Sequence, residues 1–146
     1  MISRELAREL AAYLQWEPHN GDQFFIPRPE IADSVFLMSD MVVELITRNG
    51  DTRFHFNGTV EWALDSVELG DVVWLPREDQ LRELLRGTFR SLRRLAGEPV
   101  RYAVEIELAG ATRVFEDEVA ENAYAEALLA LVSSLSVDLD DVDELV

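Results

Sequence analysis

The chain lacks cysteine and lysine altogether, so its 13 basic residues are all arginines. Without cysteine it can have no disulfide, no thiolate metal site and no cysteine nucleophile. Without lysine it has neither a Schiff-base lysine nor the phosphate-binding lysine of a P-loop. No apolar run approaches the ~18–20 residues of a membrane span, and residues 1–5 do not resemble a signal peptide. We therefore expect a cytoplasmic protein.

Positive charge is scarce as well. The 146 residues carry 29 acidic and 13 basic side chains, which gives a net charge of −16. This excess disfavours nucleic acids and anionic membranes as partners, because both repel an acidic surface. A basic protein partner is allowed, and attraction between opposite charges would speed its encounter. Solubility alone is the simpler explanation of the same charge.

The length and composition predict one domain. A chain of 146 residues lies within the usual range of a single domain, and a hydrophobic content of 48% is ordinary for a globular protein. We predict a single α+β domain over residues 1–136, followed by an acidic tail over residues 137–146. The acids of this tail alternate with apolar residues and are Asp138, Asp140, Asp141, Asp143 and Glu144.

Three helices are predicted from apolar residues at helical spacing. Ser3 is the expected cap of the first, which ends near Leu14. The second runs from Pro76 to about Leu95, because proline suits the first helical position and Gly97 follows the end. Asp117 caps the third, which ends near Leu135.

The remaining segments predict strands, because apolar residues alternate between turn signals. The expected strands are Gln23–Pro27, Ser34–Ser39, Met41–Arg48, Thr52–Asn57, Asp71–Leu75, Pro99–Leu108 and Thr112–Glu116. Asn49-Gly50 and Ala109-Gly110 predict hairpin turns. The order is α-β-β-β-β-(β)-α-β-β-α, so we predict one antiparallel sheet of about five to seven strands with three main helices packed on it.

Catalytic motifs are absent from the sequence. There is no GxSxG, GxGxxG, Walker or HExxH pattern, and His19 and His55 are expected to face solvent. We therefore predict no catalytic, cofactor-binding or metal-binding residue and no cofactor. The alternative is a small metal-dependent enzyme that uses a carboxylate cluster. Its candidate acids fall in two pairs, each four residues apart: Asp40 with Glu44, and Glu61 with Asp65.

The tryptophans Trp16, Trp62 and Trp74 each lie at the end of a predicted element, beside proline, glycine or acidic residues. Tryptophans in such positions usually close the rim of a core. The alternative is a recognition surface, because tryptophan is enriched in binding hot spots.

Four arginines would form a stripe along the predicted helix 76–95: Arg82, Arg86, Arg90 and Arg93. An exposed face, supported by the i,i+4 pair of Glu78 and Arg82, is the simpler interpretation. The sharper hypothesis is that the acidic tail, Asp138–Glu144, docks on this stripe, either within one chain or from a second copy.

Several motifs resemble one family over nearly the whole chain. They are Phe56-Asn57-Gly58-Thr59, Glu61-Trp62-Ala63-Leu64-Asp65-Ser66-Val67 and Trp74-Leu75-Pro76-Arg77-Glu78-Asp79-Gln80-Leu81, with Trp16…Pro18…Gly21-Asp22…Phe24…Pro27 ahead and Ala123…Ala125-Glu126-Ala127-Leu128-Leu129 behind. The pattern is similar to a family of small actinobacterial proteins with no assigned activity, often labelled as pilus-assembly proteins of the CpaE type. That label implies a nucleotide-binding ATPase, whereas the chain has neither a Gly-rich phosphate loop nor a lysine. The element order also looks like the secretion-chaperone-like α+β fold.

The function we predict is a non-catalytic protein-binding module, such as an adaptor, a chaperone-like factor or an immunity-type inhibitor. Its partner would be a protein, of basic character on charge grounds, and the module itself is a candidate homodimer. Nucleic-acid mimicry, with acids in two rows at phosphate-like spacing, is a third interpretation.

Overall fold

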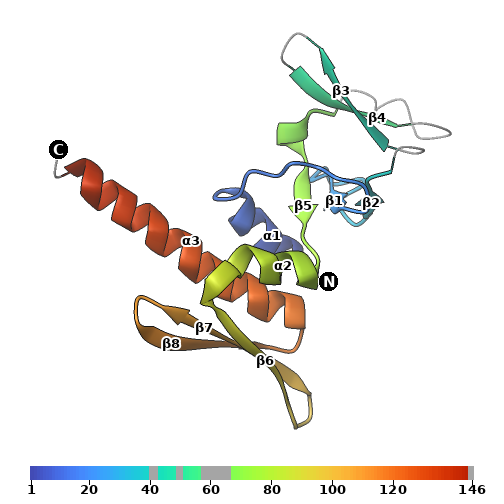
Figure 1. The fold of residues 1–146 in the computed structure, drawn as a ribbon. Coiled ribbons are helices and arrows are strands. Elements are labelled where there is room, and N and C mark those ends of the chain that lie inside the picture. The colour runs from blue at the N-terminus through green and yellow to red at the C-terminus, as the bar shows by residue number, and fades with distance from the viewer. Residues whose placement is uncertain (40–42, 49–50, 57–66, 145–146) are drawn as a thin grey trace. The chain divides into compact units, whose positions relative to one another are not determined.

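The chain divides into two compact units. The computed structural model describes residues 1–39, 43–48, 51–56 and 67–144, and for 43–48, 51, 53–56 and 136–144 it describes the backbone alone. Unit 1 consists of Met1–Leu14 and Arg77–Val146, and unit 2 consists of Gln15–Pro76. The described residues form three α-helices and eight strands, labelled in Figure 1. In sequence, unit 2 is thus an insertion between the first helix and the rest of unit 1.

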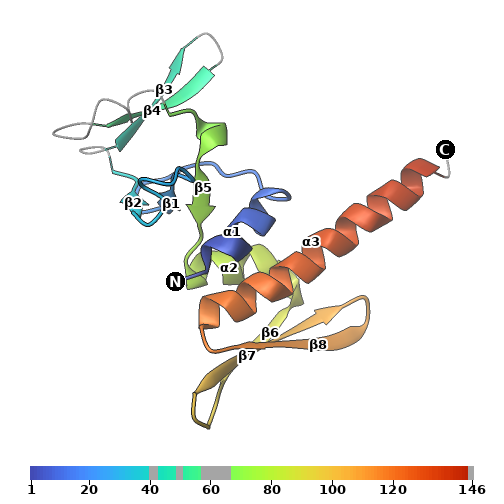
Figure 2. The same ribbon diagram turned by 180° about the vertical axis from the view of Figure 1, so that it is seen from behind.

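Unit 1 is built around the long helix α3, Ala120–Glu144. Helices α1 (Arg4–Ala11) and α2 (Glu78–Leu85) pack on one side of α3 and a β-sheet packs on the other (Figures 1 and 2). The buried residues of α3 are small apart from two: Ala123, Tyr124, Ala125, Ala127 and Leu128. The alanines let neighbouring elements come close to the helix axis, and Tyr124 and Leu128 fill the space between them.

Helix α1 begins where the sequence predicts. The Oγ atom of Ser3 accepts a hydrogen bond from the backbone N–H of Leu6 at 3.2 Å, which confirms Ser3 as the cap. The backbone N–H of Ser3 also donates to Oδ1 of Asn122 at 2.8 Å. This bond ties the start of α1 to the first turn of α3.

The sheet of unit 1 has three antiparallel strands in the order β6-β7-β8. Their bounds are Phe89–Leu95, Arg101–Leu108 and Ala111–Asp117. Val104 and Ile106 of β7 share one face of the sheet and are fully buried, and α3 packs on β7. The predicted turn between β7 and β8 is confirmed, because Ala109 and Gly110 have φ angles of 52° and 80°. A two-residue hairpin with both φ angles positive matches the twist of its strands.

Helix α3 begins at Ala120, three residues after the predicted cap Asp117, which ends β8, and it continues further than predicted. Asp117 Oδ1 accepts a hydrogen bond from the backbone N–H of Val119 at 2.9 Å, just before the first helical residue. The predicted end near Leu135 is wrong, because the helix runs to Glu144. Residues 136–144 contain no proline or glycine to stop it. Most of the predicted acidic tail is therefore helical.

The predicted helix from Pro76 to Leu95 is also wrong. Helix α2 ends at Leu85, a 3₁₀ turn follows at Arg86–Thr88, and Phe89 begins the strand β6. Arg86 has a φ angle of 52°, which an α-helix cannot contain. The hydroxyl of Thr88 donates to the carbonyl oxygen of Leu85 at 2.6 Å and closes the helix end.

Strand β6 also explains why the sequence looked helical here. Phe89 lies opposite Ile106, Leu92 lies opposite Val104, and the register shifts between Phe89 and Ser91. The irregularity leaves one extra residue on β6, so Phe89 and Leu92 share a face although they are three residues apart. A spacing of three is otherwise typical of a helix.

Unit 2 holds a small antiparallel sheet in the order β2-β1-β5 and a separate hairpin. The strands of the sheet are β1 (Gln23–Phe25), β2 (Phe36–Leu37) and β5 (Val73–Leu75). The hairpin consists of β3 (Val43–Arg48) and β4 (Asp51–Phe56), and its expected turn, Asn49-Gly50, lies outside the described residues. The core residues are Phe24, Ile26, Met38, Val67 and Val72.

The α+β class with three helices is confirmed, but the single sheet is wrong. The described strands form two three-stranded sheets and one hairpin instead of one sheet of five to seven strands. Alternation along a strand identifies its buried face without specifying which strands pair. Here α3 covers the sheet of unit 1, and a separate aromatic and aliphatic core lies in unit 2.

Candidate functional site

Two of the three tryptophans stack on each other in unit 2. The ring centroids of Trp16 and Trp74 are 6.2 Å apart and their planes differ by 5°. Trp16 also contacts Phe24, with centroids 5.6 Å apart, and both tryptophans are half-buried. Trp62 lies outside the described residues. The stack therefore closes the rim of the unit 2 core, next to Phe24.

A buried carboxylate holds Trp16 in place. Asp22 is 4% exposed, and its Oδ2 atom accepts hydrogen bonds from Nε1 of Trp16 and from the backbone N–H of His19, both at 3.0 Å. The His19 ring is exposed, with Nδ1 2.7 Å from the carbonyl oxygen of Glu17. Nε1 of Trp74 is buried without a hydrogen-bond partner among the described residues. This arrangement secures a turn and offers no acid–base pair.

The four predicted arginines do not share a helix face. Arg82 lies on α2, Arg86 follows the end of that helix, and Arg90 and Arg93 lie on β6. The reason is the break after Leu85 described above. Arg90 pairs with Glu107 of β7 at 3.1 Å, and both side chains are 46% exposed, so the pair contributes little stability.

The predicted tail acids Asp138, Asp140 and Asp141 lie on the last turns of α3, where only the backbone is described. Docking of this segment on the arginines remains a prediction. Arg82 has a different neighbour, Tyr124 of α3. Burial raises the pKa of the Tyr124 phenol, and Arg82 partly opposes that rise.

The carboxylates proposed for a metal-dependent enzyme give no site that can be described. Asp40, Glu61 and Asp65 lie outside the described residues, and Glu44 lies on β3 with its backbone alone described. Within the described ranges, no three His, Asp or Glu side chains gather closely enough to hold a metal ion. In the same part of the chain, no helix has both the length and the apolar character needed to cross a membrane.

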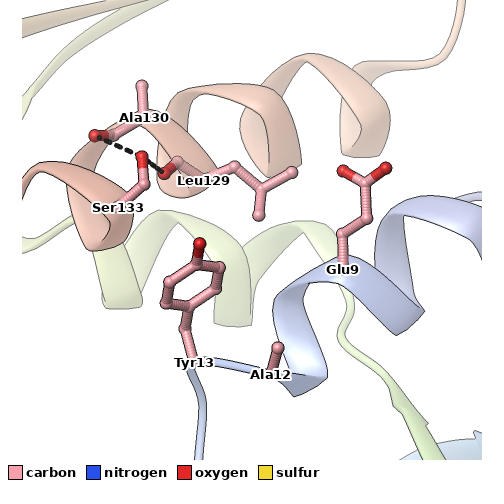
Figure 3. Close-up of a pocket in the computed structure, with 6 residues that line it drawn as sticks. All are labelled: Glu9, Ala12, Tyr13, Leu129, Ala130 and Ser133. Atoms are coloured by element: carbon pink, nitrogen blue, oxygen red, sulfur yellow. Dashed lines mark hydrogen bonds between the residues drawn. The ribbon is translucent and has the colours of Figure 1, made fainter. Parts of the chain in front are cut away.

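An apolar groove lies between the end of α1 and the middle of α3 in unit 1. Its volume is about 470 Å³, and its lining residues are Glu9, Ala12, Tyr13, Leu129, Ala130 and Ser133. Figure 3 shows Tyr13 and Glu9 at opposite ends, with Ala12 and Leu129 between them. Tyr13 is 47% exposed. This groove is the candidate functional site.

The polar groups of the groove are arranged so that its centre is apolar. The hydroxyl of Ser133 donates to the carbonyl oxygen of Leu129 at 2.6 Å and approaches that of Ala130 at 3.3 Å, as drawn in Figure 3. A serine bonded to its own helix in this way presents no free donor to a ligand. The ionisable groups are Glu9 and Tyr13, which stand at the two ends.

Sequence reasoning missed this groove. The helical spacing of apolar residues puts Tyr13 with Leu6 and Leu10 on the apolar face of the first helix, and on the last helix it predicts a core stripe that includes Tyr124, Leu128 and Leu131. Leu129 and Ala130 fall outside that stripe. The available signal was the width of the apolar arc on α3, since Leu129 and Val132 add to the side that carries Leu128 and Leu131. An apolar arc wider than one core face indicates a second contact.

No protein-family model, curated protein or solved structure matches the chain.

Proposed function

We propose that this chain is a non-catalytic protein-binding module, acting as an adaptor, a chaperone-like factor or an immunity-type inhibitor. The groove between α1 and α3 would receive the apolar face of a helix from the partner protein. The observation that carries the proposal is the groove itself, an apolar depression bordered by a half-exposed tyrosine. Apolar grooves between helices are a recurring way to bind amphipathic helices.

The side chains of the groove suit a helix. Ala12, which follows α1, and Ala130 on α3 are small, so a partner side chain can enter between the two helices. Tyr13 and Leu129 add aromatic and aliphatic surface, and tyrosine is enriched at protein interfaces. Ser133 already has its hydrogen bond, so covering it leaves no unpaired donor. Burial of its apolar centre would therefore release water without leaving the Ser133 hydroxyl unpaired.

The same residues argue against chemistry in this groove. Ser133 has a hydroxyl of the kind that acts as a nucleophile in enzymes. This hydroxyl donates to backbone carbonyl oxygens and not to a general base, so it is not activated. Glu9 and Tyr13 stand at opposite ends, where they cannot act as a close acid–base pair. Binding is thus the activity that the groove supports best.

The test compares two adjacent alanines of the first helix. Ala12 lines the groove, whereas Ala11 is exposed and outside it. The probe is a fluorescent amphipathic peptide of about 18 residues, helical, with a leucine face and a glutamine face, titrated with the full chain. We expect Ala12→Arg to weaken binding by roughly tenfold or more and Ala11→Arg to leave it unchanged, because only the first fills the groove.

Thermal melts of both variants check that the fold is intact. Equal binding by the two variants would place the interaction elsewhere on the surface. Failure of the unaltered chain to bind the peptide at millimolar concentration would count against the groove as a helix-binding site.

A further inference from the structure

We infer that the helix received by the groove is basic, with positive side chains flanking its apolar face. This inference rests on the proposed function and concerns the chemistry of the partner. Three observations carry it: the acidic rim of the groove, the charge of the segment that extends α3, and the position of that charge at the helix end.

The described rim of the groove is acidic at one end. Glu9 is exposed there, and no basic residue is among those that line the groove. The chain carries ten acidic residues and no arginine after Arg113. A partner helix that lies along α3 from the groove toward Glu144 therefore meets Glu9 beside the groove and further acidic residues from position 138 onward.

The face of α3 that lines the groove continues toward the C-terminal end of the helix. Positions 129 and 133 share this face with positions 137, 140 and 144, and two of the last three are acidic, Asp140 and Glu144. From Leu129 to Glu144 the helix axis rises by about 23 Å, a length that a partner helix of four to five turns can follow.

The charge on this last segment opposes the stability of the helix that carries it. Residues 138–144 include five acids, and the last turn of α3 has no basic residue. Negative charge at a helix C-terminus is unfavourable to the helix dipole, and acids three and four residues apart repel each other. A basic partner would relieve both effects, so its charge is complementary to this end of the helix.

A second copy of the chain is the competing occupant. Each copy has a net charge of −16, and parallel pairing of α3 with α3 would bring the two acidic segments together, while antiparallel pairing would still join two chains of the same sign. Like charges placed opposite each other across an interface cost binding free energy. The same charge argument that favours a basic partner therefore disfavours a homodimer through this face.

The test uses three fluorescent peptides with one leucine face in common. Their polar faces carry lysine, glutamine or glutamate, and each is titrated against the full chain over a range of salt. The variants are Ala12→Arg, its control Ala11→Arg, and a neutralised chain with Asp138→Asn, Asp140→Asn, Asp141→Asn, Asp143→Asn and Glu144→Gln. Sedimentation of the unaltered chain measures self-association.

We expect the lysine peptide to bind roughly tenfold or more tightly than the glutamine peptide at low salt, with the advantage shrinking as salt rises. The neutralised chain should lose that advantage while it keeps its affinity for the glutamine peptide. Ala12→Arg should weaken the binding of both the lysine and the glutamine peptide. Ala11→Arg should leave the affinity for the glutamine peptide unchanged and lower that for the lysine peptide only slightly.

The two proposals fail in different ways. If the glutamine peptide binds in the groove and lysine adds no affinity, the inference of a basic partner is wrong and the proposed function stands. If the lysine peptide binds the chain and the Ala12→Arg variant equally, the acids act without the groove, and the proposed function is wrong. If sedimentation finds a dimer and Ala12→Arg dissociates it, the groove binds a second copy of the chain, and the inference of a basic partner helix is wrong.

Discussion

Asp22 offers the sharpest test of how unit 2 is held together. Its carboxylate is 4% exposed and accepts hydrogen bonds from Nε1 of Trp16 and from the backbone N–H of His19. The substitution Asp22→Ala removes the oxygen that accepts both bonds and leaves the two donors behind. Asp22→Asn keeps one oxygen at nearly the same place and removes the charge, so it separates the acceptor from the charge.

The expected loss follows from the two bonds. An unsatisfied donor shielded from water costs about 1–3 kcal/mol. Trp16 is half-buried, so its share lies near the lower end, and we expect Asp22→Ala to lower the free energy of unfolding by about 2–4 kcal/mol. Hydrogen bonds to a neutral acceptor are weaker than those to a carboxylate, so Asp22→Asn should lower it by about 1 kcal/mol.

Urea unfolding followed by tryptophan fluorescence measures this loss of stability in unit 2. All three tryptophans lie within residues 15–76, so their emission reports unit 2. For a typical urea dependence, the midpoint of Asp22→Ala should fall by about 1–2 M. Far-ultraviolet circular dichroism, dominated by the helices of unit 1, serves as the internal control.

Two outcomes would refute this reasoning. A stability of Asp22→Ala within about 0.5 kcal/mol of the unaltered chain would mean that water satisfies both donors. Equal losses in Asp22→Ala and Asp22→Asn would mean that the charge of Asp22, and not its role as acceptor, holds the turn.

Three further predictions concern unit 1. Arg86 has a φ angle of 52°, which glycine adopts with less strain. Arg86→Gly should therefore raise the free energy of unfolding by about 1 kcal/mol, measured by thermal or urea unfolding. A lower free energy of unfolding would show that contacts of the arginine side chain stabilise the fold by more than the backbone strain destabilises it. Burial raises the pKa of Glu126, Asp117 adds to the rise and Arg101 opposes it. Because its pKa is higher in the folded chain, protonated Glu126 favours the folded state. Its contribution to the free energy of unfolding is therefore complete below the pKa of the unfolded chain, and it is lost as the pH rises through the pKa of the folded chain. Glu126→Gln should therefore raise the melting temperature at neutral pH and have little effect below about pH 4, and the reverse pattern would contradict the burial argument. Finally, deletion of residues 137–146 should lower the melting temperature or change the elution volume in a salt-sensitive way if the acidic segment docks on arginines, and unchanged values at low salt would remove that hypothesis.

Local signals were the part of the fold that the sequence could predict. The cap at Ser3 and the turn at Ala109-Gly110 depend on residues within a few positions of each other, and both are found. Such features need no knowledge of distant contacts, because the side chain and the backbone group that it bonds are neighbours in the chain.

The break after Leu85 depends on contacts that the local sequence does not contain. Leucines and arginines at Leu81–Leu95 suit a helix by propensity and spacing. Phe89 instead packs on the ring of Tyr124, with centroids 5.8 Å apart, and lies opposite Ile106. Tertiary packing against α3 and β7 outweighs helix propensity here, and the irregularity in β6 hides the strand period from a reader of the sequence.

The candidate groove illustrates the same limit. Its residues come from positions 9–13 and 129–133, more than a hundred residues apart in sequence. Tyr13 and Leu129 could each be assigned to an apolar face, but the pairing of the two faces depends on how α1 lies against α3. Periodicity gives the face of each helix and leaves its neighbour open.

The insertion of unit 2 within unit 1 has a consequence for the order of folding during synthesis. Residues 15–76 are complete in sequence long before the ribosome reaches α3, so unit 2 can form while unit 1 still lacks its central helix. The apolar side of the first helix, with Ile2, Ala7 and Leu10 buried in the finished structure, has no α3 to pack on during this interval. At ordinary translation rates, the roughly 110 residues from Leu10 to Ala120 take about 5–20 s to synthesise. Helix α1 leaves the ribosome before α2 and α3, so it is among the last elements of unit 1 to be secured, and for those seconds it is an amphipathic segment open to chaperones.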